Sequence, residues 1–119
     1  MKHRMTLATA IPKEVRDKVY TRDRHRCVVC GRYIPHDEET DTYRFGSPTA
    51  HYIRRSQGGK GIEENVVTLC FKCHDDFDNG RLRVEIGDWL SEYLEEQYPD
   101  FPDSKRIYNK YEWLDEFID

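Results

Sequence analysis

Residues 70–78 read Cys-Phe-Lys-Cys-His-Asp-Asp-Phe-Asp, and residues 27–30 read Cys-Val-Val-Cys. Each Cys-x-x-Cys turn can direct both sulfur atoms toward one metal ion, and two such turns complete a tetrahedral site of four thiolates. The spacing predicts a structural zinc ion held by Cys27, Cys30, Cys70 and Cys73. Such a site has no open coordination position, so we expect it to hold the fold together and to take no part in catalysis.

Two other uses of paired cysteines agree less well with the sequence. Disulfides are typical of secreted proteins, and the first ten residues, MKHRMTLATA, lack the apolar stretch of a secretion signal. A redox pair needs one such motif in a thioredoxin-like setting, whereas this small polar chain has two. No apolar run approaches about 18 residues, so we expect no membrane partner and a cytoplasmic location.

The composition fits one small domain. The chain has 119 residues, of which 37% are hydrophobic and 35% are charged. A domain of this size with so few apolar residues buries a thin core, and a metal site is a common source of the missing stability. The composition therefore gives the predicted zinc site a structural purpose.

Charge is unevenly distributed along the chain. Residues 1–83 hold sixteen Lys and Arg against twelve Asp and Glu, a balance of +4, and residues 84–119 hold three against eleven, a balance of −8. The overall net charge of −4 therefore hides a basic part and does not exclude nucleic acid as a partner. We expect residues 1–83 to form the functional domain. Residues 84–119 are expected to form its acidic helical extension, which either solvates an exposed helix or contacts another protein.

Local patterns predict an α+β fold. Pro12 and the apolar spacing after it indicate a helix over residues 12–23. β-Branched residues indicate strands at 49–54 and 66–69, joined through the glycine-rich loop 57–61. A loop or hairpin with strand character at 42–45 precedes them, and a helix is expected from Phe71 to Asp78.

The extension is predicted to contain a helix capped by Asp88 and ended by Pro99. Its apolar stripe would consist of Trp89, Leu90, Tyr93, Leu94 and Tyr98. A last amphipathic stretch holds Ile107, Tyr111, Leu114 and Ile118.

The helix after the second cysteine pair carries a histidine and a carboxylate on one face. His74 and Asp78 are four residues apart, about one helical turn. An imidazole and a carboxylate presented together form part of a divalent-metal site with nitrogen and oxygen ligands. Upstream, His51 lies in the first of the two strands, and Asn65 immediately precedes the second. The predicted unit is therefore two strands and a helix, with a histidine on the first strand and metal ligands on the helix.

Three segments of this unit, in this order, resemble HNH endonucleases, the ββα-metal nucleases. They are His51-Tyr-Ile-Arg-Arg-Ser-Gln-Gly-Gly59, Glu64-Asn-Val-Val-Thr-Leu-Cys70 and Cys73-His74. The stretch Arg22-Asp23-Arg-His-Arg-Cys27-Val-Val-Cys-Gly31 is similar to the start of the zinc-knuckle subgroup, many of whose members come from bacteria and phages. The resemblance covers about residues 12–80 and implies a small ββα-metal domain with zinc knuckles.

The resemblance also implies a reaction, the metal-dependent hydrolysis of DNA phosphodiester bonds by nicking or double-strand cleavage. His51 would be the general base that activates water, and Asn65 would hydrogen-bond near His51 and hold its ring in a productive orientation. His74 would ligate the catalytic metal, and Asp78 matches the position of a further ligand. A bacterial protein, or one that a phage encodes within its host, would act in the cytoplasm.

One position departs from the family pattern. Many members have an Asp or His ligand immediately before the base, where this chain has Ala50. His74 and Asp78 then remain as protein ligands, and water and substrate phosphate can complete the shell of Mg²⁺ or of another divalent ion such as Mn²⁺ or Ni²⁺. Two other interpretations stay open, namely that His51 is itself a ligand or that activity is weak or lost.

Basic residues near the predicted site are candidates for contacts with DNA phosphates. The nearest are Arg54, Arg55, Lys60 and Lys72, and a basic start containing Arg16, Lys18, Arg22, Arg24 and Arg26 extends them. Such contacts position a strand without identifying its sequence. The alternative function is a non-catalytic zinc-knuckle module that binds DNA or protein. We expect either a monomer or a homodimer.

Overall fold

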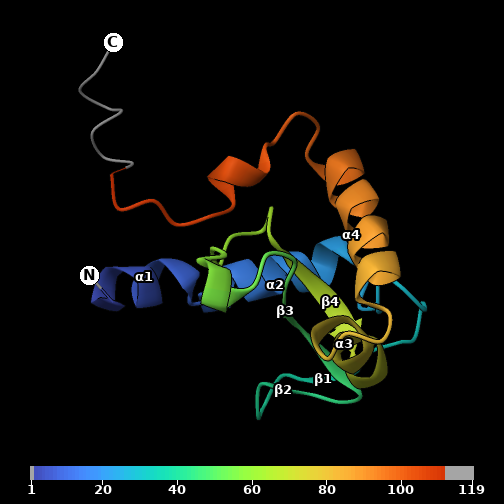
Figure 1. The fold of residues 1–119 in the computed structure, drawn as a ribbon. Helices are drawn as coiled ribbons and strands as arrows, with labels where there is room; N and C mark the ends of the chain where they lie inside the picture. Colours follow the sequence, from blue (N-terminus) through green and yellow to red (C-terminus); the bar gives the residue numbers. More distant parts are fainter. Residues whose placement is uncertain (1, 112–119) are drawn as a thin grey trace.

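The computed structural model describes residues 2–111 and contains two small antiparallel sheets, of which the second along the chain packs among helices and the first projects at one end (Figure 1). The helices are α1 (Lys2–Thr9), α2 (Lys13–Arg22), α3 (Phe71–Asp78) and α4 (Arg83–Gln97), with 3₁₀ turns at Arg55–Gln57 and Asp103–Lys105. The strands are β1 (His36–Asp37), β2 (Thr42–Tyr43), β3 (Gly46–His51) and β4 (Val66–Cys70). No described helix has the length and apolar character needed to cross a membrane.

The predicted α+β class is confirmed, and most predicted elements are present with shifted ends. β3 begins three residues before the predicted strand and ends at His51. The helix predicted from Asp88 in fact begins at Arg83, so Asp88 lies inside α4 and does not cap it. α1 was not predicted, because residues 2–9 have no apolar stripe. Ile107 is in a bridge with Gly59 rather than in a helix, and Leu114 and Ile118 lie outside the described residues.

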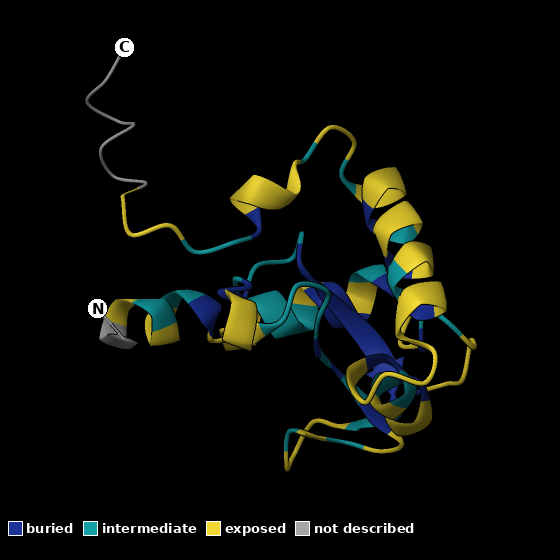
Figure 2. Ribbon diagram, viewed as in Figure 1, coloured by how far each residue is buried: buried dark blue, intermediate teal, exposed yellow. Residues whose placement is uncertain are grey.

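The β3–β4 hairpin and α3 form the ββα unit at the centre of the molecule. The register pairs Gly46 with Cys70 at one end and His51 with Val66 at the other. Gly46 is required here, because a Cβ would lie 2.3 Å from the carbonyl oxygen of Leu69. All of β4 is buried, since α2 and α3 both pack against it (Figure 2). The hairpin therefore holds the second cysteine pair and His51 at opposite ends of one rigid element.

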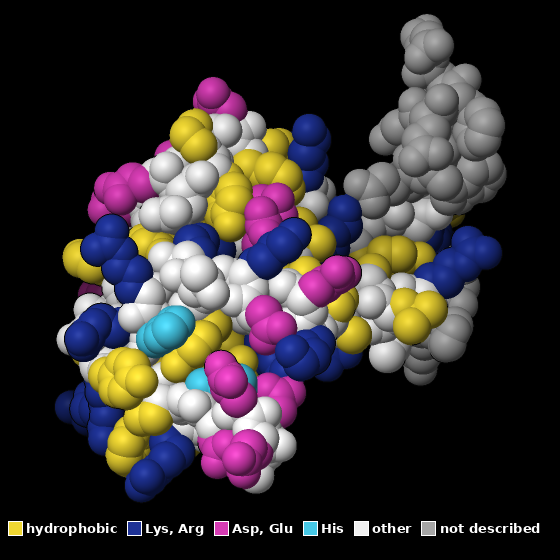
Figure 3. All heavy atoms as spheres, turned by 180° about the vertical axis from the view of Figure 1, so that it is seen from behind, with side chains coloured by type: hydrophobic (Ala, Val, Ile, Leu, Met, Phe, Trp, Pro, Cys, Tyr) yellow, Lys and Arg dark blue, Asp and Glu magenta, His cyan; other side chains and the backbone are white. Residues whose placement is uncertain are grey.

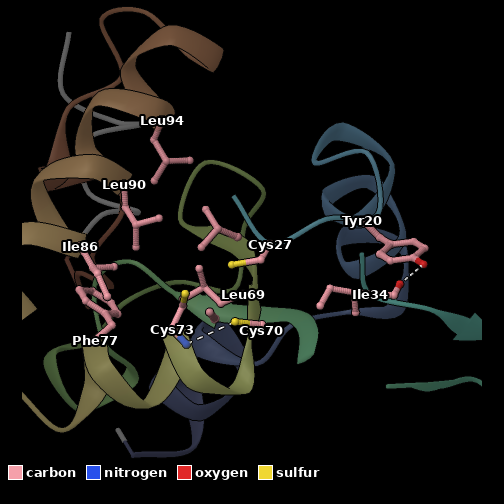
Figure 4. Close-up of a cluster of buried hydrophobic side chains, with 12 residues drawn as sticks. Tyr20, Cys27, Ile34, Leu69, Cys70, Cys73, Phe77, Ile86, Leu90 and Leu94 are labelled. Carbon is pink, nitrogen blue, oxygen red and sulfur yellow. Dashed lines mark hydrogen bonds between the residues drawn. The ribbon is translucent and has the colours of Figure 1, made fainter. Parts of the chain in front are cut away.

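α4 completes the core. Its buried residues, Ile86, Leu90 and Leu94, point toward the strand and α3, where they meet Leu69 and Phe77 (Figure 4). On the same helix, Trp89 donates a hydrogen bond to the carbonyl oxygen of Val28, 2.7 Å away in the first cysteine turn. The apolar side of α4 therefore packs in the core, and the acidic residues of α4 lie on its outer side.

A buried ion pair ties α2 to β4 and α4. Arg22 donates to Asp23 and also to the carbonyl oxygens of Glu63 and Val66. Asp23 accepts hydrogen bonds from the backbone N–H of Thr68 and from the hydroxyl of Tyr93. Burial alone would lower the pKa of Arg22, but its bonds to Asp23 outweigh this effect and raise it. Arg22 therefore serves the fold, and its predicted place in a DNA-binding track is wrong.

Replacing Asp23 by alanine is expected to lower the free energy of unfolding by about 3 to 5 kcal/mol, because the change leaves Arg22 buried without its counter-ion. Urea unfolding measures this loss. Asp17→Ala is the matched control, since this partly exposed residue of α2 forms a surface pair with Lys13, and its loss should cost less than about 0.5 kcal/mol. Equal effects of the two substitutions would contradict a structural role for the buried pair.

Candidate functional site

The four cysteines come together as predicted. The ligand atoms of Cys27, Cys30, Cys70 and Cys73 all lie within 4.8 Å of one another. The sulfur atoms of Cys30 and Cys70 are 3.6 Å apart, close to the roughly 3.8 Å between two thiolates that share a tetrahedral zinc ion. The structure therefore positions these residues to bind a metal ion.

Local geometry explains how each pair reaches the cluster. In the first turn, the N–H of Gly31 donates to the carbonyl oxygen of Cys27, and Gly31 has φ of +79°, which favours glycine. In the second pair, Cys70 ends β4 and its sulfur accepts the N–H of Cys73 in the first turn of α3. Burial and the neighbouring sulfur atoms raise the pKa of Cys73. A cluster of thiolates at this place therefore requires a cation, which agrees with its four-sulfur donor set.

A separate pocket of about 320 Å³ lies beside the other end of the β3–β4 hairpin. It is lined by Thr49, His51, Arg54, Arg55, Ser56, His74 and Asp78. The pocket thus brings together five of the eight predicted site residues outside the cysteine cluster, namely His51, Arg54, Arg55, His74 and Asp78. β3, the loop after it and α3 supply these side chains.

His51 is held by the end of α1. Its Nε2 atom lies 2.8 Å from the carbonyl oxygen of Thr9. A carbonyl oxygen only accepts hydrogen bonds, so Nε2 carries the proton, and Nδ1 is the ring atom that can accept one. Burial lowers the pKa of His51 below its ordinary value of about 6.5, and the bond to Thr9 only partly opposes this effect. The neutral ring is therefore the dominant form near pH 7.

His74 and Asp78 lie together on α3. Nε2 of His74 and Oδ2 of Asp78 are 2.9 Å apart. Two ligands at about 2.1 Å from one octahedral ion, at a right angle, are about 3 Å apart, so this pair fits the requirement for a shared divalent ion. Among the described residues, the cysteines form the only group of three or more ligand residues within 4.8 Å. The pocket therefore contains an adjacent imidazole and carboxylate, which contact each other directly in this structure.

Ala50 has a structural explanation. Alternate residues of a strand face opposite sides, and Ala50 is 1% exposed within the hydrophobic core, whereas Thr49 and His51 line the pocket. A carboxylate at position 50 of this strand would be buried among apolar side chains. The departure from the family pattern therefore follows from how β3 is placed here.

Asn65 supports the loop that follows His51. Its side-chain oxygen accepts the N–H of Ile53 at 2.8 Å, and its amide group donates to the carbonyl oxygens of Ile53 and Lys60. Asn65 is fully buried, and its own carbonyl oxygen accepts the N–H of Tyr52. The structure thus makes Asn65 a positioning residue for the segment between His51 and the glycine-rich loop, while Thr9 orients the imidazole ring.

The basic residues divide into two groups. Arg54 and Arg55 line the pocket, where Arg54 donates to the carbonyl oxygen of Asp78 and Arg55 to the hydroxyl of Thr9. Lys72 pairs with Asp76 at 2.9 Å and, two positions from His74, faces the opposite side of α3. Lys60 lies in the loop that Asn65 braces. The structure therefore brings two of the four predicted phosphate contacts to the site.

Thr9 and Thr49 are the site residues that the sequence analysis missed. Thr49 lies two positions before His51 on the same strand, so strand alternation was a usable signal for it. Thr9 contributes mainly a backbone carbonyl, which leaves no signature in residue type. Its position depends on the close approach of α1 to Gly61, where a Cβ would lie 1.9 Å from the carbonyl oxygen of Ala10.

Comparison with known proteins agrees with this geometry. The family model described as HNH endonuclease matches residues 27–80. A protein named Anaredoxin, from Nostoc sp. (strain PCC 7120 / SAG 25.82 / UTEX 2576), is 27% identical over 74 residues, which are 62% of this chain and 84% of that protein. No solved structure gives a significant match. The family match spans both cysteine pairs and the side chains of His51, His74 and Asp78.

Proposed function

The chain carries an HNH endonuclease domain at residues 27–80, and on this premise we propose that it hydrolyses DNA phosphodiester bonds with the help of a divalent metal ion. The observation that carries the proposal is the pocket itself. It combines His51, whose lowered pKa favours the neutral ring and whose Nε2 faces the carbonyl oxygen of Thr9, with the adjacent pair His74 and Asp78. A zinc-binding module without catalysis has no use for this combination.

His51 acts as the general base. Its Nδ1 atom takes a proton from water, the water oxygen forms a bond to phosphorus, and the bond from phosphorus to the leaving sugar oxygen breaks. The bond from Nε2 to Thr9 keeps the ring in place while Nδ1 becomes protonated. His74 and Asp78 would hold a divalent ion such as Mg²⁺, Mn²⁺ or Ni²⁺, which would supply charge stabilisation at the phosphate and the leaving oxygen.

Other residues of the chain hold the substrate and the site in register. Arg54 and Arg55 lie in the pocket wall and offer cationic contacts to neighbouring phosphates. The side chain of Asn65 hydrogen-bonds to the N–H and the carbonyl oxygen of Ile53, and so holds the start of the segment that carries both arginines. The cysteine cluster binds structural zinc and anchors α3, which carries the ligand pair. The core contacts of α4 support the proposal that the acidic extension is part of the same domain.

Incubation of the purified protein with supercoiled plasmid and Mg²⁺, Mn²⁺ or Ni²⁺ tests the proposal. We expect conversion to nicked or linear plasmid, and we expect Asp78→Ala to raise the metal concentration for half-maximal cleavage by about tenfold or more, because one of two ligands is lost. Asp76→Ala is the matched control, since Asp76 is also an α3 carboxylate in an i,i+4 pair but lies on the other face. It should cleave like the parent.

Two results would contradict the proposal. If the plasmid stays intact with every metal while the protein still binds DNA, the chain is a non-catalytic DNA-binding module. Equal losses in Asp76→Ala and Asp78→Ala would show that the substitutions act on the stability of α3 rather than on a metal site.

A further inference from the structure

Exposed aromatic and basic side chains gather around the first cysteine turn and the start of α3. The group, here called the knuckle patch, consists of Arg26, Arg32, Tyr33, Arg44, Phe45 and Phe71. The exposed fractions of Tyr33, Phe45 and Phe71 are 51%, 39% and 62%. In the view from behind, basic and hydrophobic side chains interleave at the lower left of the molecule (Figure 3).

The arginines of the knuckle patch stack on its rings. Arg32 lies 4.1 Å and Arg44 lies 5.2 Å from the centre of the Phe45 ring. Arg26 lies 5.9 Å from the ring centre of Tyr33. Across residues 4–111, none of these three arginines forms an ion pair with an acidic side chain. The patch thus combines arginines that have no acidic partner among the described residues with aromatic rings that are partly exposed.

Phe45 is held in a conformation that disfavours a bulky residue. Its φ is +70°, in the left-handed region where glycine and asparagine are common. The turn lets the carbonyl oxygen of Phe45 accept the N–H of Phe71 at 2.8 Å, and this bond uses only the backbone of Phe45. A partly exposed ring kept at a strained position indicates a role outside the core.

The knuckle patch lies at a defined distance from the pocket. Gly46, next to Phe45, pairs with Cys70, next to Phe71, and His51 pairs at the other end of the same hairpin. β3 has an irregular register between Ser47 and Ala50, so the distance is taken along β4, where four residue steps of about 3.3 Å from Cys70 to Val66 separate these ends by roughly 13 Å.

We propose that the knuckle patch binds unpaired DNA bases beside the cleavage position, so that the substrate is DNA with a single-stranded segment near the cut. The inference rests on the proposed nuclease function and specifies its substrate. Exposed aromatic rings bind the faces of unstacked bases, and unpaired arginines neutralise the phosphates between them. Duplex DNA offers the same phosphates but keeps its base faces covered, which favours the single strand.

Fluorescence anisotropy with zinc-loaded protein and no other divalent ion tests the proposal without cleavage. The probes are an oligo(dT) of about 20 nucleotides, which is longer than typical site sizes, an oligo(rU) of equal length and a duplex of equal length. We expect the parent to bind oligo(dT) about tenfold more tightly than the duplex. Phe45→Gly removes the ring at a position where glycine is relaxed, and it should weaken oligo(dT) binding about tenfold while the melting temperature is kept.

Tyr111→Ala is the matched control, because Tyr111 is 56% exposed and also carries a cation, Lys110, 4.9 Å from its ring centre. It should bind all probes like the parent. Phe71→Ala provides a second variant within the patch and should weaken oligo(dT) binding in the same direction. Agreement between the two patch variants would support the proposal independently of any single substitution.

Three results would overturn the proposal. They are equal affinity of the parent for oligo(dT) and duplex, unchanged oligo(dT) binding in Phe45→Gly, and tighter binding of oligo(rU) than of oligo(dT). Failure of the nuclease proposal looks different. In that case oligo(dT) binding would depend on Phe45 while plasmid stayed intact with every metal, and the patch would remain as a binding site for single-stranded DNA.

Discussion

Replacing Cys70 by serine is expected to leave the chain unfolded at room temperature. Cys70 contributes to the fold in three ways, as the last residue of β4, as the N-cap of α3 and as one corner of the four-sulfur cluster. Structural zinc sites in small domains supply about 10 to 16 kcal/mol of apparent folding free energy. Native domains are stable by only about 5 to 15 kcal/mol, so loss of the zinc site removes the whole margin.

Circular dichroism and zinc analysis measure this outcome, and Cys30→Ser provides the comparison. Cys30 is the one exposed member of the cluster, so water can take the vacated position, and Cys30 caps no helix. We expect Cys30→Ser to retain weaker zinc binding and a lowered melting temperature, and Cys70→Ser to retain neither zinc nor helix. A Cys70→Ser variant that melts like the parent would refute the zinc assignment.

The cysteine cluster and the ββα unit could be predicted because their signals are local. A Cys-x-x-Cys turn fixes the distance between its two sulfur atoms, and the spacing of His74 and Asp78 fixes their common face on α3. Strand and helix boundaries near these motifs were correct within a few residues for the same reason. Local spacing therefore carried most of the information about the metal-binding side chains.

What remained hidden depends on contacts between distant segments. Thr9 orients His51 across 42 positions of the chain, and it does so through a backbone carbonyl that any residue type provides. In the sequence, Arg22 has the pattern of a surface cation. In the structure, its guanidinium group donates to Asp23, to the hydroxyl of Tyr98 and to the carbonyl oxygen of Val66. A basic residue in a polar sequence has the same local signature whether it ends in solvent or in a buried ion pair. Tertiary packing alone distinguishes the two.

His51→Ala is expected to reduce plasmid cleavage by about a hundredfold to ten-thousandfold, the usual contribution of a positioned general base. His36→Ala is the matched control. His36 is also a partly buried histidine with a hydrogen-bonded Nε2, here to Asp41 at 2.8 Å, but it lies on β1 and away from the pocket. The control should cleave like the parent, and both variants should retain zinc and the parent's circular dichroism spectrum. Cleavage by His51→Ala at the parent's rate would rule out the general base.

The pH dependence of cleavage gives an independent test of the same residue. Burial lowers the pKa of His51, so its neutral, proton-accepting form persists below the ordinary value of about 6.5. As the pH falls, kcat/KM for plasmid cleavage should therefore stay level through neutrality and then decline with a midpoint below about 6.5, because protonation removes the base. A midpoint above that value would contradict a buried His51 base. At a saturating metal concentration, where protonation of the ligand His74 no longer limits metal binding, this acid limb should disappear from the residual activity of His51→Ala, whereas His36→Ala should keep it unchanged.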